Sequence, residues 1–548
     1  MNRVDTDVII VGGGPCGLML ANELGQRGIS VIVFNEREGT SPLPQANATQ
    51  ARTMEHFRRL GFASEIRKRG LPPDYPTDIT YFTRYTKHEL ARFALPSSKN
   101  AEEAIQKMRG SWSAAELPHR ISQMFVEEVL YEQALRIPSV ELKFGKRVNQ
   151  ILDDGNLCKA IIGADGQEEN FISKYLVGCD GPRSLVRKYL NIELIGESGE
   201  ARDFMGGRMH AIYFQSDDLY QRLNAREAWM YWAFNGDRRS FMAAIDGKSK
   251  FVFHTQLKPE EEKVEISDAK ARSMFFEAFG DKIDIKIISR LSWTAGLTLV
   301  ANSFNKGRIF IAGDAAHLFT PTGGLGYNTG IEDAVNLGWK LAAVLKGWGQ
   351  NKLLDSYNTE RHQSALRNTS FARQFADSIG KYKASDNLED ETVIGKEARK
   401  KAGDYLSSHA RAEFNIPGIT FGYRYDGSSV LSVVNEVPPP DKANEYQPSG
   451  IPGGRAPHFW IDKNLSIYDK FGFDFTLICF RVYLDIEAVR SLAIKRSLPI
   501  KILELYNEEI RATYGASFVL IRPDQIICWR GENFSNFESI ISTVTGRK

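Results

Sequence analysis

The apolar positions of this sequence first gather in a short run, Asp7 to Val11, which has the length and composition of a buried strand. Three glycines in GxGxxG spacing follow, Gly12, Gly14 and Gly17, and a helix-forming segment comes next. Between a strand and a helix, such glycines allow a tight turn and let a pyrophosphate approach the backbone. The pattern predicts an α/β dinucleotide-binding domain in this part of the chain.

The next apolar strand, Ser30 to Phe34, ends at two polar residues, Asn35 and Glu36. In dinucleotide-binding folds an acidic side chain at this point holds the ribose hydroxyls. Asn35 occupies the position where the carboxylate often stands, and Glu36 comes one residue later. Glu36 is favoured on chemistry, but the choice between the two stays open. A carboxylate here would repel a 2′-phosphate, so the pattern favours FAD or NAD over NADP as the bound dinucleotide.

A second apolar run, Arg308 to Ala312, ends at Gly313 and Asp314, as a parallel strand does at the carboxyl edge of its sheet, where ligands bind. Asp314 is suited to accept hydrogen bonds from sugar-like hydroxyls. The loop beyond it should let backbone N–H groups approach a flat ring, because it is built from Pro321, Gly323, Gly324 and Gly326. A helix is predicted to start near Asn328, with its positive end towards this loop. An ordinary α/β connection would show the same pattern, so both interpretations stand on this stretch alone.

Further polar residues lie at the ends of predicted elements. Arg52, at the start of an amphipathic helix, is a candidate phosphate contact. A later helix is predicted to carry Arg120 and Gln123 towards the cofactor, and Asp180 follows another strand in a strand-end turn. A solvated arginine and a plain β-turn are the alternative interpretations of these features.

Residues 192–290 alternate between apolar and polar positions and are rich in aromatic side chains, which predicts a mainly antiparallel sheet. Laid against the dinucleotide-binding domain, this sheet would wall off an apolar pocket for an aromatic substrate. The candidates for activating a phenol-like substrate are Tyr231, His210 and His254. Tyrosines and histidines within sheets are more often structural, and that alternative stays open for all three.

The C-terminal part is predicted to form a separate unit. Residues 427–454 are rich in Pro, Gly and Ser and form a linker. Residues 455–548 alternate strand and helix patterns, which predicts a small α/β domain. This segment has no CxxC motif and therefore no obvious redox role.

Composition narrows the classes of function. A chain of 548 residues is expected to form two or three domains. With 70 basic and 68 acidic residues it gives no reason to expect nucleic acid as a partner. No apolar run has the length of a membrane span, and the first residues run directly into a strand, so a cytoplasmic location is expected. The five cysteines have no metal-ligand spacing, which predicts reduced thiols and no metal site.

Three motifs in the predicted order resemble those of class A FAD-dependent aromatic hydroxylases, of the phenol hydroxylase and 2,4-dichlorophenol hydroxylase type. They are GGGPCG with its following strand, CDGPRSLVR, and GRIFIAGDAAHLFTPTGGLGYNTGIEDAVNLGWKLA. The tail, with PGGRAPHFW and VLIRPDQIICWRG, resembles the thioredoxin-like C-terminal domain of the phenol hydroxylase branch. That domain is usually linked to subunit contacts, so the resemblance suggests a homodimer.

The resemblance implies a domain plan. A Rossmann-like FAD-binding domain of the aromatic hydroxylase type, with following helices, would comprise residues 1–77, 119–190 and 296–400. A mainly antiparallel substrate domain would be inserted as residues 78–118 and 191–295, and residues 455–548 would form the thioredoxin-like α/β domain.

The resemblance also implies how FAD is held. Gly12, Gly14 and Gly17 would face the pyrophosphate and Glu36 the adenosine ribose, with Asn35 as a departure that leaves the ribose contact open. Arg52 and Gln123 match positions at the phosphate and ribityl region, Asp180 would support both FAD and the reductant, and Asp314 would bind the ribityl chain. The residues expected to border the isoalloxazine are Pro321, Gly323, Gly324 and Asn328.

By the same resemblance, the enzyme would take a hydride from NADPH or NADH, which visits transiently without a Rossmann domain of its own. It would react with dioxygen and hydroxylate a phenol-like ring through a flavin C4a-hydroperoxide. Epoxidation, Baeyer–Villiger insertion or oxidative decarboxylation on the same fold would show the same motifs. A non-catalytic flavin-binding protein is the less favoured alternative. No motif identifies the substrate or chooses between NADPH and NADH.

Overall fold

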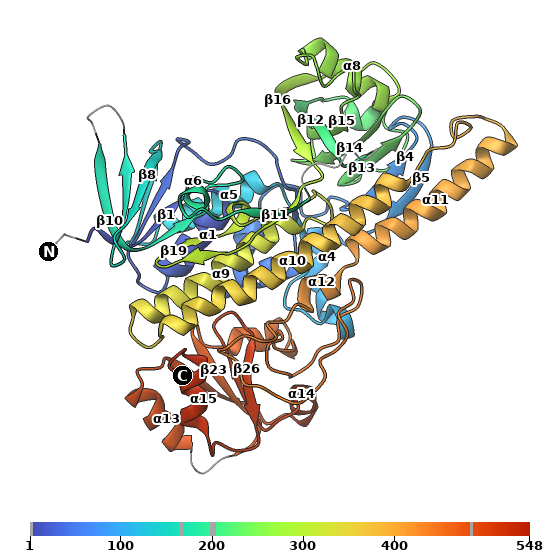
Figure 1. The fold of residues 1–548 in the computed structure, drawn as a ribbon. Coiled ribbons are helices and arrows are strands. Elements are labelled where there is room, and N and C mark those ends of the chain that lie inside the picture. Colours follow the sequence, from blue (N-terminus) through green and yellow to red (C-terminus); the bar gives the residue numbers. More distant parts are fainter. Residues whose placement is uncertain (1–3, 164–167, 198–203, 483–485) are drawn as a thin grey trace.

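The computed structural model describes residues 4–163, 168–197, 204–482 and 486–548 (Figure 1). Its N-terminal part is built on a sheet in the order β18-β19-β10-β1-β2-β7, to which β9 and β8 attach through β10. The strands are β1 (Thr6–Val11), β2 (Val31–Asn35), β7 (Val140–Phe144), β8 (Val148–Asp153), β9 (Cys158–Ile162), β10 (Glu169–Gly178), β18 (Asn305–Lys306) and β19 (Ile309–Ile311). The predicted strands are present, and the apolar residues of β1, β2 and β19 at the centre of the sheet are buried, as expected for parallel strands covered on both faces.

Helices cover this sheet and connect its strands. The helix α1 (Pro15–Gly25) packs between α5 (Gln123–Leu135) and α9 (Leu325–Leu345). The helix predicted near Asn328 begins three residues earlier, since Gly324 takes a left-handed conformation (φ 61°) and closes the preceding loop. The shorter elements here are β3 (Ala48–Thr49), α2 (Ala51–Arg59), α3 (Ala63–Arg67), β6 (His119–Arg120), α6 (Leu185–Tyr189), β11 (Leu194–Glu197), β17 (Thr298–Ala301) and β20 (His317–Leu318).

A seven-stranded sheet in the order β16-β12-β15-β14-β13-β4-β5 forms the predicted second domain, and only the β13–β4 pair is parallel. Its strands are β4 (Ile79–Phe82), β5 (Glu89–Phe93), β12 (Gly207–Gln215), β13 (Met230–Phe234), β14 (Arg239–Ala244), β15 (Lys250–Gln256) and β16 (Lys286–Ala295). Phe275 of α8 (Asp268–Phe279) packs on one face, against Phe253 at 5.3 Å between ring centroids, and α7 (Leu219–Arg222) lies nearby. The expected mainly antiparallel sheet is therefore present.

Two segments depart from the predicted domain plan. The helices α4 (Ser98–Lys107) and η1 (Gly110–Trp112) leave the seven-stranded sheet, and Trp112 packs on Phe421 with ring centroids 5.8 Å apart. The apolar side of α4, at Ala101 and Ile105, packs in the same apolar cluster as Trp112 and Phe421. The helix α11 (Val393–Phe414) continues past residue 400 and packs on β5.

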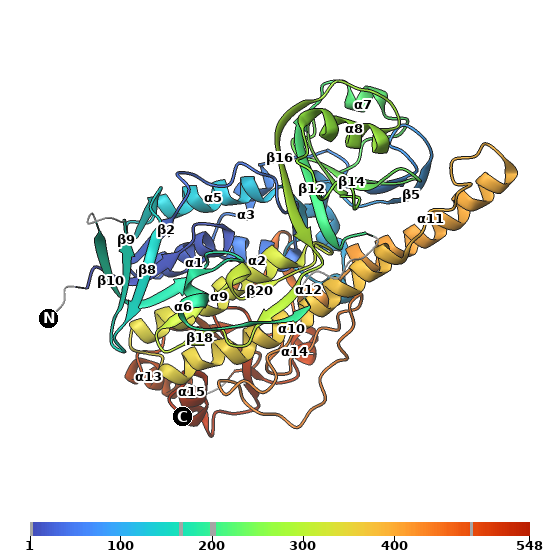
Figure 2. The same cartoon turned by 45° about the horizontal axis from the view of Figure 1, so that its top comes forward.

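Two long helices join the parts of the molecule. Figure 2 shows α10 (Asn351–Lys381) running from the N-terminal sheet towards the seven-stranded sheet, with α11 beside its far end. None of the helices among the described residues is both long enough and apolar enough to cross a membrane.

The C-terminal segment forms a small sheet in the order β24-β23-β25-β26, with helices around it. Its elements are β21 (Trp460–Asp462), β22 (Leu465–Ser466), β23 (Phe475–Cys479), α13 (Ile486–Lys495), β24 (Ile500–Glu504), α14 (Glu508–Tyr514), β25 (Phe518–Ile521), β26 (Ile527–Gly531) and α15 (Phe537–Val544). The preceding stretch, 415–459, contains the short helix α12 (Pro417–Phe421). Trp339 of α9 packs edge-on against Phe475, so this unit docks beneath α9 and α10 (Figure 1). A small α/β unit was expected here, and its thioredoxin-like character stays a prediction.

Candidate functional site

The carboxyl ends of four neighbouring parallel strands lie level with one another. Val11 pairs with both Phe34 and Gly178, and Gly178 pairs with Ile311. The residues that directly follow these strands therefore line one edge of the sheet, as the sequence predicted for Gly12, Glu36, Asp180 and Asp314.

The three glycines after β1 have different surroundings. A Cβ placed on Gly12 would lie 2.2 Å from the carbonyl oxygen of Cys179, and one on Gly17 would lie 2.0 Å from that of Gly12. A Cβ on Gly14 would meet no atom of the described residues within 4 Å. Gly14 is also the N-cap of α1, and no side chain caps that end. Two glycines thus allow close packing, while the third leaves open space at a helix N-terminus suited to phosphate.

This difference predicts two distinct variants. Gly17→Ala should destabilise the protein by about 1–3 kcal/mol or more, because its methyl group collides with backbone. Gly14→Ala should keep the melting temperature of the flavin-free protein and weaken FAD binding about tenfold, because it narrows the space for the pyrophosphate. Melting curves and FAD titration of both variants test this. Equal effects of the two substitutions on stability would contradict it.

The two polar residues at the end of β2 face in different directions. The Asn35 side chain is buried; its Oδ1 accepts a hydrogen bond from the Gly13 amide at 3.3 Å, and its Nδ2 donates to the Arg37 carbonyl. The Glu36 side chain is exposed, with Arg147 3.9 Å away. Asn35 therefore supports the glycine turn, while the Glu36 carboxylate remains accessible at the sheet edge.

Asp314 lies in the short turn η2 (Gly313–Ala315) with its side chain open to solvent. None of the described residues donates a hydrogen bond to its carboxylate. Although the side chain reaches solvent, the protein around it partly desolvates the Asp314 carboxylate and raises its pKa, and His317 opposes that rise. A carboxylate with all its acceptor positions available suits a ligand that carries hydroxyl groups.

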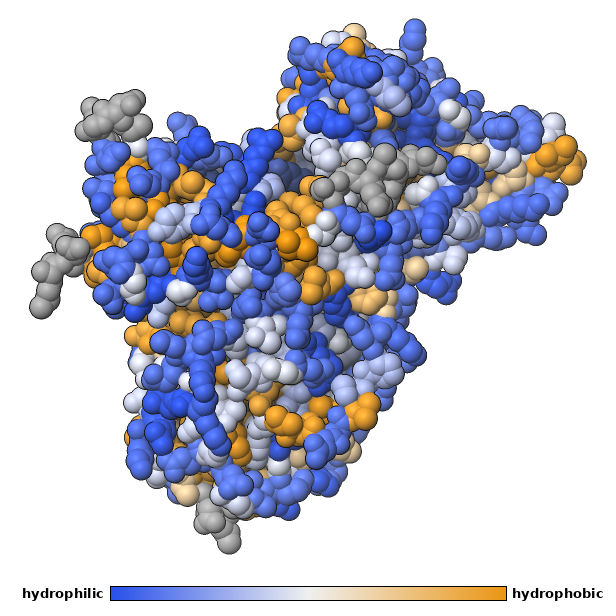
Figure 3. Space-filling model, viewed as in Figure 1, coloured by the Kyte–Doolittle hydropathy of each residue, from blue (hydrophilic) through white to orange (hydrophobic). Residues whose placement is uncertain are grey.

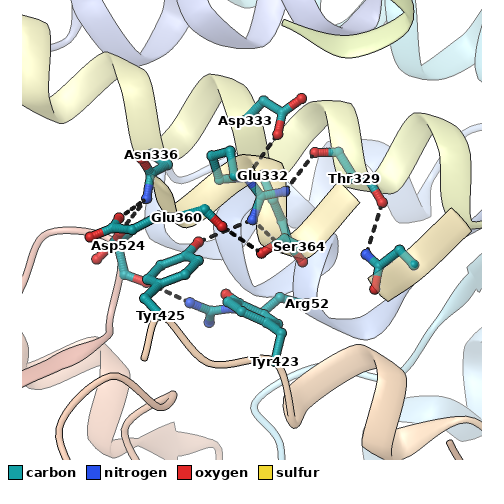
Figure 4. A network of polar contacts seen from close by, with 12 residues as sticks. Arg52, Thr329, Glu332, Asp333, Asn336, Glu360, Ser364, Tyr423, Tyr425 and Asp524 are labelled. Atoms are coloured by element: carbon teal, nitrogen blue, oxygen red, sulfur yellow. Dashed lines mark hydrogen bonds and ion pairs between the residues drawn. The ribbon is translucent and has the colours of Figure 1, made fainter. Parts of the chain in front are cut away.

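The turn that carries Asp314 is joined to α9 by a buried polar cluster of Asp333, His317 and Arg361. Asp333 accepts hydrogen bonds from the Gly313 amide (3.0 Å), His317 Nε2 (2.6 Å) and Arg361 Nε (2.7 Å). Burial alone would raise the pKa of Asp333, but the interactions with His317 and Arg361 hold it below its usual value. Figure 4 shows Asp333 and Glu332 on α9 among the contacts of this cluster. One sequence feature could have indicated this cluster: Asp333 is a carboxylate beside the packed positions of a largely apolar helix.

The glycine loop before α9 is held from both sides. The Gly323 amide donates to Glu413 Oε1 and its carbonyl accepts from Gln50 Nε2, both at 2.8 Å. Gly323 and Gly324 both have positive φ, and a Cβ on Gly324 would lie 3.0 Å from that of Ala48. No side chain caps the N-terminus of α9, so its backbone N–H groups stay available to a ligand. Sequence reasoning missed Glu413, which comes from a helix ninety residues away. Pro321, in the same loop, is exposed.

Asn328 has a structural position in this loop. Its Oδ1 accepts from the Gln50 amide and the Thr53 hydroxyl, and its Nδ2 donates to the carbonyls of Ala48 and Gly324. With four hydrogen bonds to protein, its amide is fully used. Asn328 therefore shapes the loop, and its position beside the isoalloxazine stays a prediction.

Asp180 and the residues after it join two of the predicted motifs. The Asp180 carboxylate accepts from Ser184 Oγ (2.5 Å) and the Val186 amide (3.1 Å), while burial raises its pKa. Arg187 donates to the carbonyl of Ala315, next to Asp314. The turn after β10 is thus tied to the turn after β19.

Arg52 does not face the sheet edge. Its guanidinium donates to Tyr423, Glu55, Gln525 and the Asp524 carbonyl, at 2.6 to 3.2 Å. Figure 4 shows it beside Tyr423. Its hydrogen bonds join α2 to the C-terminal part of the chain, and the phosphate contact stays a prediction. Gln123, the other residue placed there, donates from Nε2 to Glu127 at 2.8 Å at the start of α5.

The strand register separates the three ring residues proposed for substrate activation. Tyr231 pairs across the strands with Met242, and Met242 pairs with Phe253, so the three side chains lie on the same face of the sheet. Phe253 packs on α8. The Tyr231 hydroxyl accepts from the Ala228 amide at 2.7 Å, and His210, on the same face, contacts Ser292 Oγ at 2.9 Å. Both are buried on the side of the sheet that faces α8. Alternate residues of a strand point to opposite faces, so both lie on the face opposite to His254, and their catalytic roles stay predictions.

His254 lies on the opposite face, in a cross-strand row with Tyr81, Trp232 and Phe241. This is the face that packs on Met124 and Phe125 of α5 through Tyr213 and Val252. His254 stacks on Phe241 at 4.6 Å between ring centroids. Three polar atoms of the row are buried without a hydrogen-bond partner among the described residues: Tyr81 OH, Trp232 Nε1 and His254 Nδ1.

Burial lowers the pKa of His254 to about 3, with a smaller contribution from His210. In the unfolded chain this histidine takes up a proton near pH 6.5, whereas in the folded chain it stays neutral. The contribution of His254 to the free energy of unfolding is therefore fully present above pH 6.5 and is lost progressively as the pH falls towards 3. When the pH is lowered from 7.5 to 5.0, the free energy of unfolding should fall in both proteins. In His254→Phe this fall should be about 2 kcal/mol smaller than in the wild type. Urea unfolding at both pH values measures this; equal losses in the two proteins would contradict it.

On the surface in Figure 3, hydrophobic residues gather over the N-terminal part, next to the base of the seven-stranded sheet. An open helix N-terminus, an accessible carboxylate and a glycine loop along one sheet edge fit a dinucleotide with a flat ring. Fold and site together are those of a dinucleotide-binding protein that also carries a second, aromatic-rich domain.

Comparison with known proteins identifies the group. Residues 5–372 match the FAD binding domain family, so the chain belongs to that family. It is 29% identical to the FAD-dependent monooxygenase apdD of Emericella nidulans over 98% of this chain and 90% of apdD. It is 27% identical to phenol 2-monooxygenase of a Pseudomonas species over 97% and 91% of the two chains. The crystal structure of RebC with bound 7-carboxy-K252c superposes with a TM-score of 0.89, at 30% identity over all of both chains. The predicted class, an FAD-dependent aromatic monooxygenase, is thereby confirmed.

Proposed function

We propose that the protein hydroxylates a phenol-like aromatic substrate with dioxygen, using electrons that NADPH or NADH delivers to FAD. The observation that carries this is the arrangement of Asp314 and the Gly323–Gly324 loop at the sheet edge, together with Ala48, which lies beside Gly324 and belongs to the same apolar core as Tyr81, Trp232 and Phe241 of the aromatic row. Bound there, FAD would supply electron transfer and oxygen activation.

The roles of the chain's own residues follow from their positions. The open space at Gly14 and the N-terminus of α1 would take the pyrophosphate, and the exposed Glu36 the adenosine ribose. Asp314 would accept hydrogen bonds from the ribityl hydroxyls. The loop at Gly323 and the N-terminus of α9 would stabilise negative charge on the reduced ring.

The row of Tyr81, Trp232, Phe241 and His254 would form the substrate wall and exclude water from the reacting ring. His254 remains the one ring candidate on this face. Its low pKa makes it neutral at pH 7, so it would act as a hydrogen-bond partner of the substrate hydroxyl.

The test is NADPH and NADH oxidation by the purified flavoprotein, with and without a panel of phenols, while hydrogen peroxide is measured in the same reaction. Strong stimulation with little peroxide supports a coupled hydroxylase. No stimulation by any phenol would contradict the proposal and favour another oxygenation on this fold, for which the likeness to RebC gives a second candidate.

A further inference from the structure

Arg120 is a buried cation without a hydrogen-bond or ion-pair partner among the described residues. Its exposure is 5%, and its guanidinium makes no hydrogen bond or ion pair with any described residue; Nη1 is buried and unsatisfied. The other buried arginines in the described part of the chain all donate to carboxylates or carbonyls: Arg27, Arg52, Arg187, Arg238, Arg361, Arg455 and Arg522. A buried, unpaired charge is unfavourable in a folded protein, so this exception calls for a functional explanation.

The position of Arg120 places that charge beside the glycine loop. It lies in β6, paired with Ala48 of β3, and Ala48 is the residue that a Cβ on Gly324 would touch at 3.0 Å. The guanidinium stands over the ring of Trp229 at 4.6 Å and near that of Phe414 at 5.9 Å. Arg120 is therefore enclosed by the loop, by the start of β13 and by the end of α11.

Glu413, the acidic group whose charge acts on Arg120, makes no hydrogen bond or ion pair with it. Glu413 accepts a hydrogen bond from the Gly323 amide at 2.8 Å, and its Oε2 lies 2.8 Å from His409 Nε2. Burial lowers the pKa of Arg120 to about 10, and Glu413 opposes that shift only in part. Arg120 thus keeps its positive charge at neutral pH.

We propose that Arg120 binds an anionic oxygen group of the substrate, so that the preferred substrate is an aromatic compound carrying a carboxylate or an ionised phenol. This rests on the proposed function, which places the flavin ring at the glycine loop. The guanidinium would donate two parallel hydrogen bonds to the anion, while Trp229 and Phe414 keep water away and strengthen the interaction.

The experiment is calorimetric titration of the purified flavoprotein with matched pairs of aromatic compounds. Salicylate and hydroxynaphthoate are each compared with their carboxamides, and pentafluorophenol is compared with phenol. In the wild type we expect the anion of a pair to bind about 30-fold more tightly than its neutral partner. In Arg120→Met this ratio should fall to about one, with affinity for the neutral partner changed by less than about twofold.

Two further variants separate charge from geometry and from folding. Arg120→Lys keeps a charge without the planar fork and should give an intermediate ratio. Arg226→Met removes the same charge from the exposed segment before Trp229, where Arg226 pairs with Asp78, and should keep the wild-type ratio. The carboxylate pairs and the phenol pair show which anion the site prefers.

The outcomes distinguish the inference from the proposed function. Equal affinities within every pair in the wild type would overturn the inference, even if the enzyme carries FAD and oxidises NADPH. An unchanged ratio in Arg120→Met, together with lost FAD or a shifted flavin potential, would also overturn it and assign the cation to the cofactor. Failure of NADPH or NADH oxidation with the anion preference intact would reject the proposed function alone.

Discussion

The Asp314→Ala variant is expected to lose FAD during purification while it keeps its fold. Asp314 makes no hydrogen bond to any described protein group, so its removal breaks no contact of the folded chain. Desolvation by the surrounding protein raises the pKa of Asp314, so a ligand that donates hydrogen bonds to the carboxylate would stabilise its charged form. Loss of two charge-assisted hydrogen bonds to the ribityl chain should weaken FAD binding by about 100-fold or more.

Flavin fluorescence titration and melting curves of the flavin-free proteins measure the two effects separately. Asp355→Ala, which removes an exposed carboxylate from α10, is the matched control and should retain FAD. An Asp314→Ala protein with normal flavin content would refute the assigned role. A large fall in the melting temperature of the flavin-free variant would show instead that Asp314 supports the fold.

The Arg522→Met variant should be strongly destabilised. Arg522 binds both oxygens of Glu360, at 2.7 and 2.9 Å, and also Asp524; the side chains of Glu360 and Arg522 are fully buried. Burial alone would raise the pKa of Glu360, but Arg522 and Lys340 hold it well below its usual value. Removing Arg522 leaves buried carboxylates short of a cation, which costs about 3–5 kcal/mol.

Urea unfolding, followed by fluorescence, measures this loss. The control is Arg511→Met, which removes an exposed arginine paired with Glu508 in the same C-terminal unit and should leave the midpoint unchanged. If both variants unfold at the wild-type midpoint, the buried pair does not hold the C-terminal unit to α9 and α10.

The sheet edge could be predicted from sequence because its signals are local. The run from Asp7 to Val11 and the glycines after it lie within one short segment, and the same holds for Asp314 after β19. A buried parallel strand and the turn that follows it are encoded by neighbouring residues, so both their presence and their common edge could be inferred.

The rest of the site depends on contacts that the sequence does not show. Tyr231 and His254 are both ring residues of the same sheet, but pairing with strands far away in the chain turns them to opposite faces. Arg52 was predicted to face phosphate because its partners, at Tyr423 and Gln525, lie more than 370 residues later. The unpaired state of Arg120 likewise becomes visible only when every nearby carboxylate has been placed.

The most direct test of the central claim is turnover with isotopically labelled dioxygen and an aromatic substrate that stimulates NADPH or NADH oxidation. If the protein is a hydroxylase, the product carries one labelled oxygen atom on its ring. One reduced nicotinamide is then consumed for each product, and little hydrogen peroxide forms. Nicotinamide oxidation that yields only peroxide, or a product whose new oxygen comes from water, would contradict that claim.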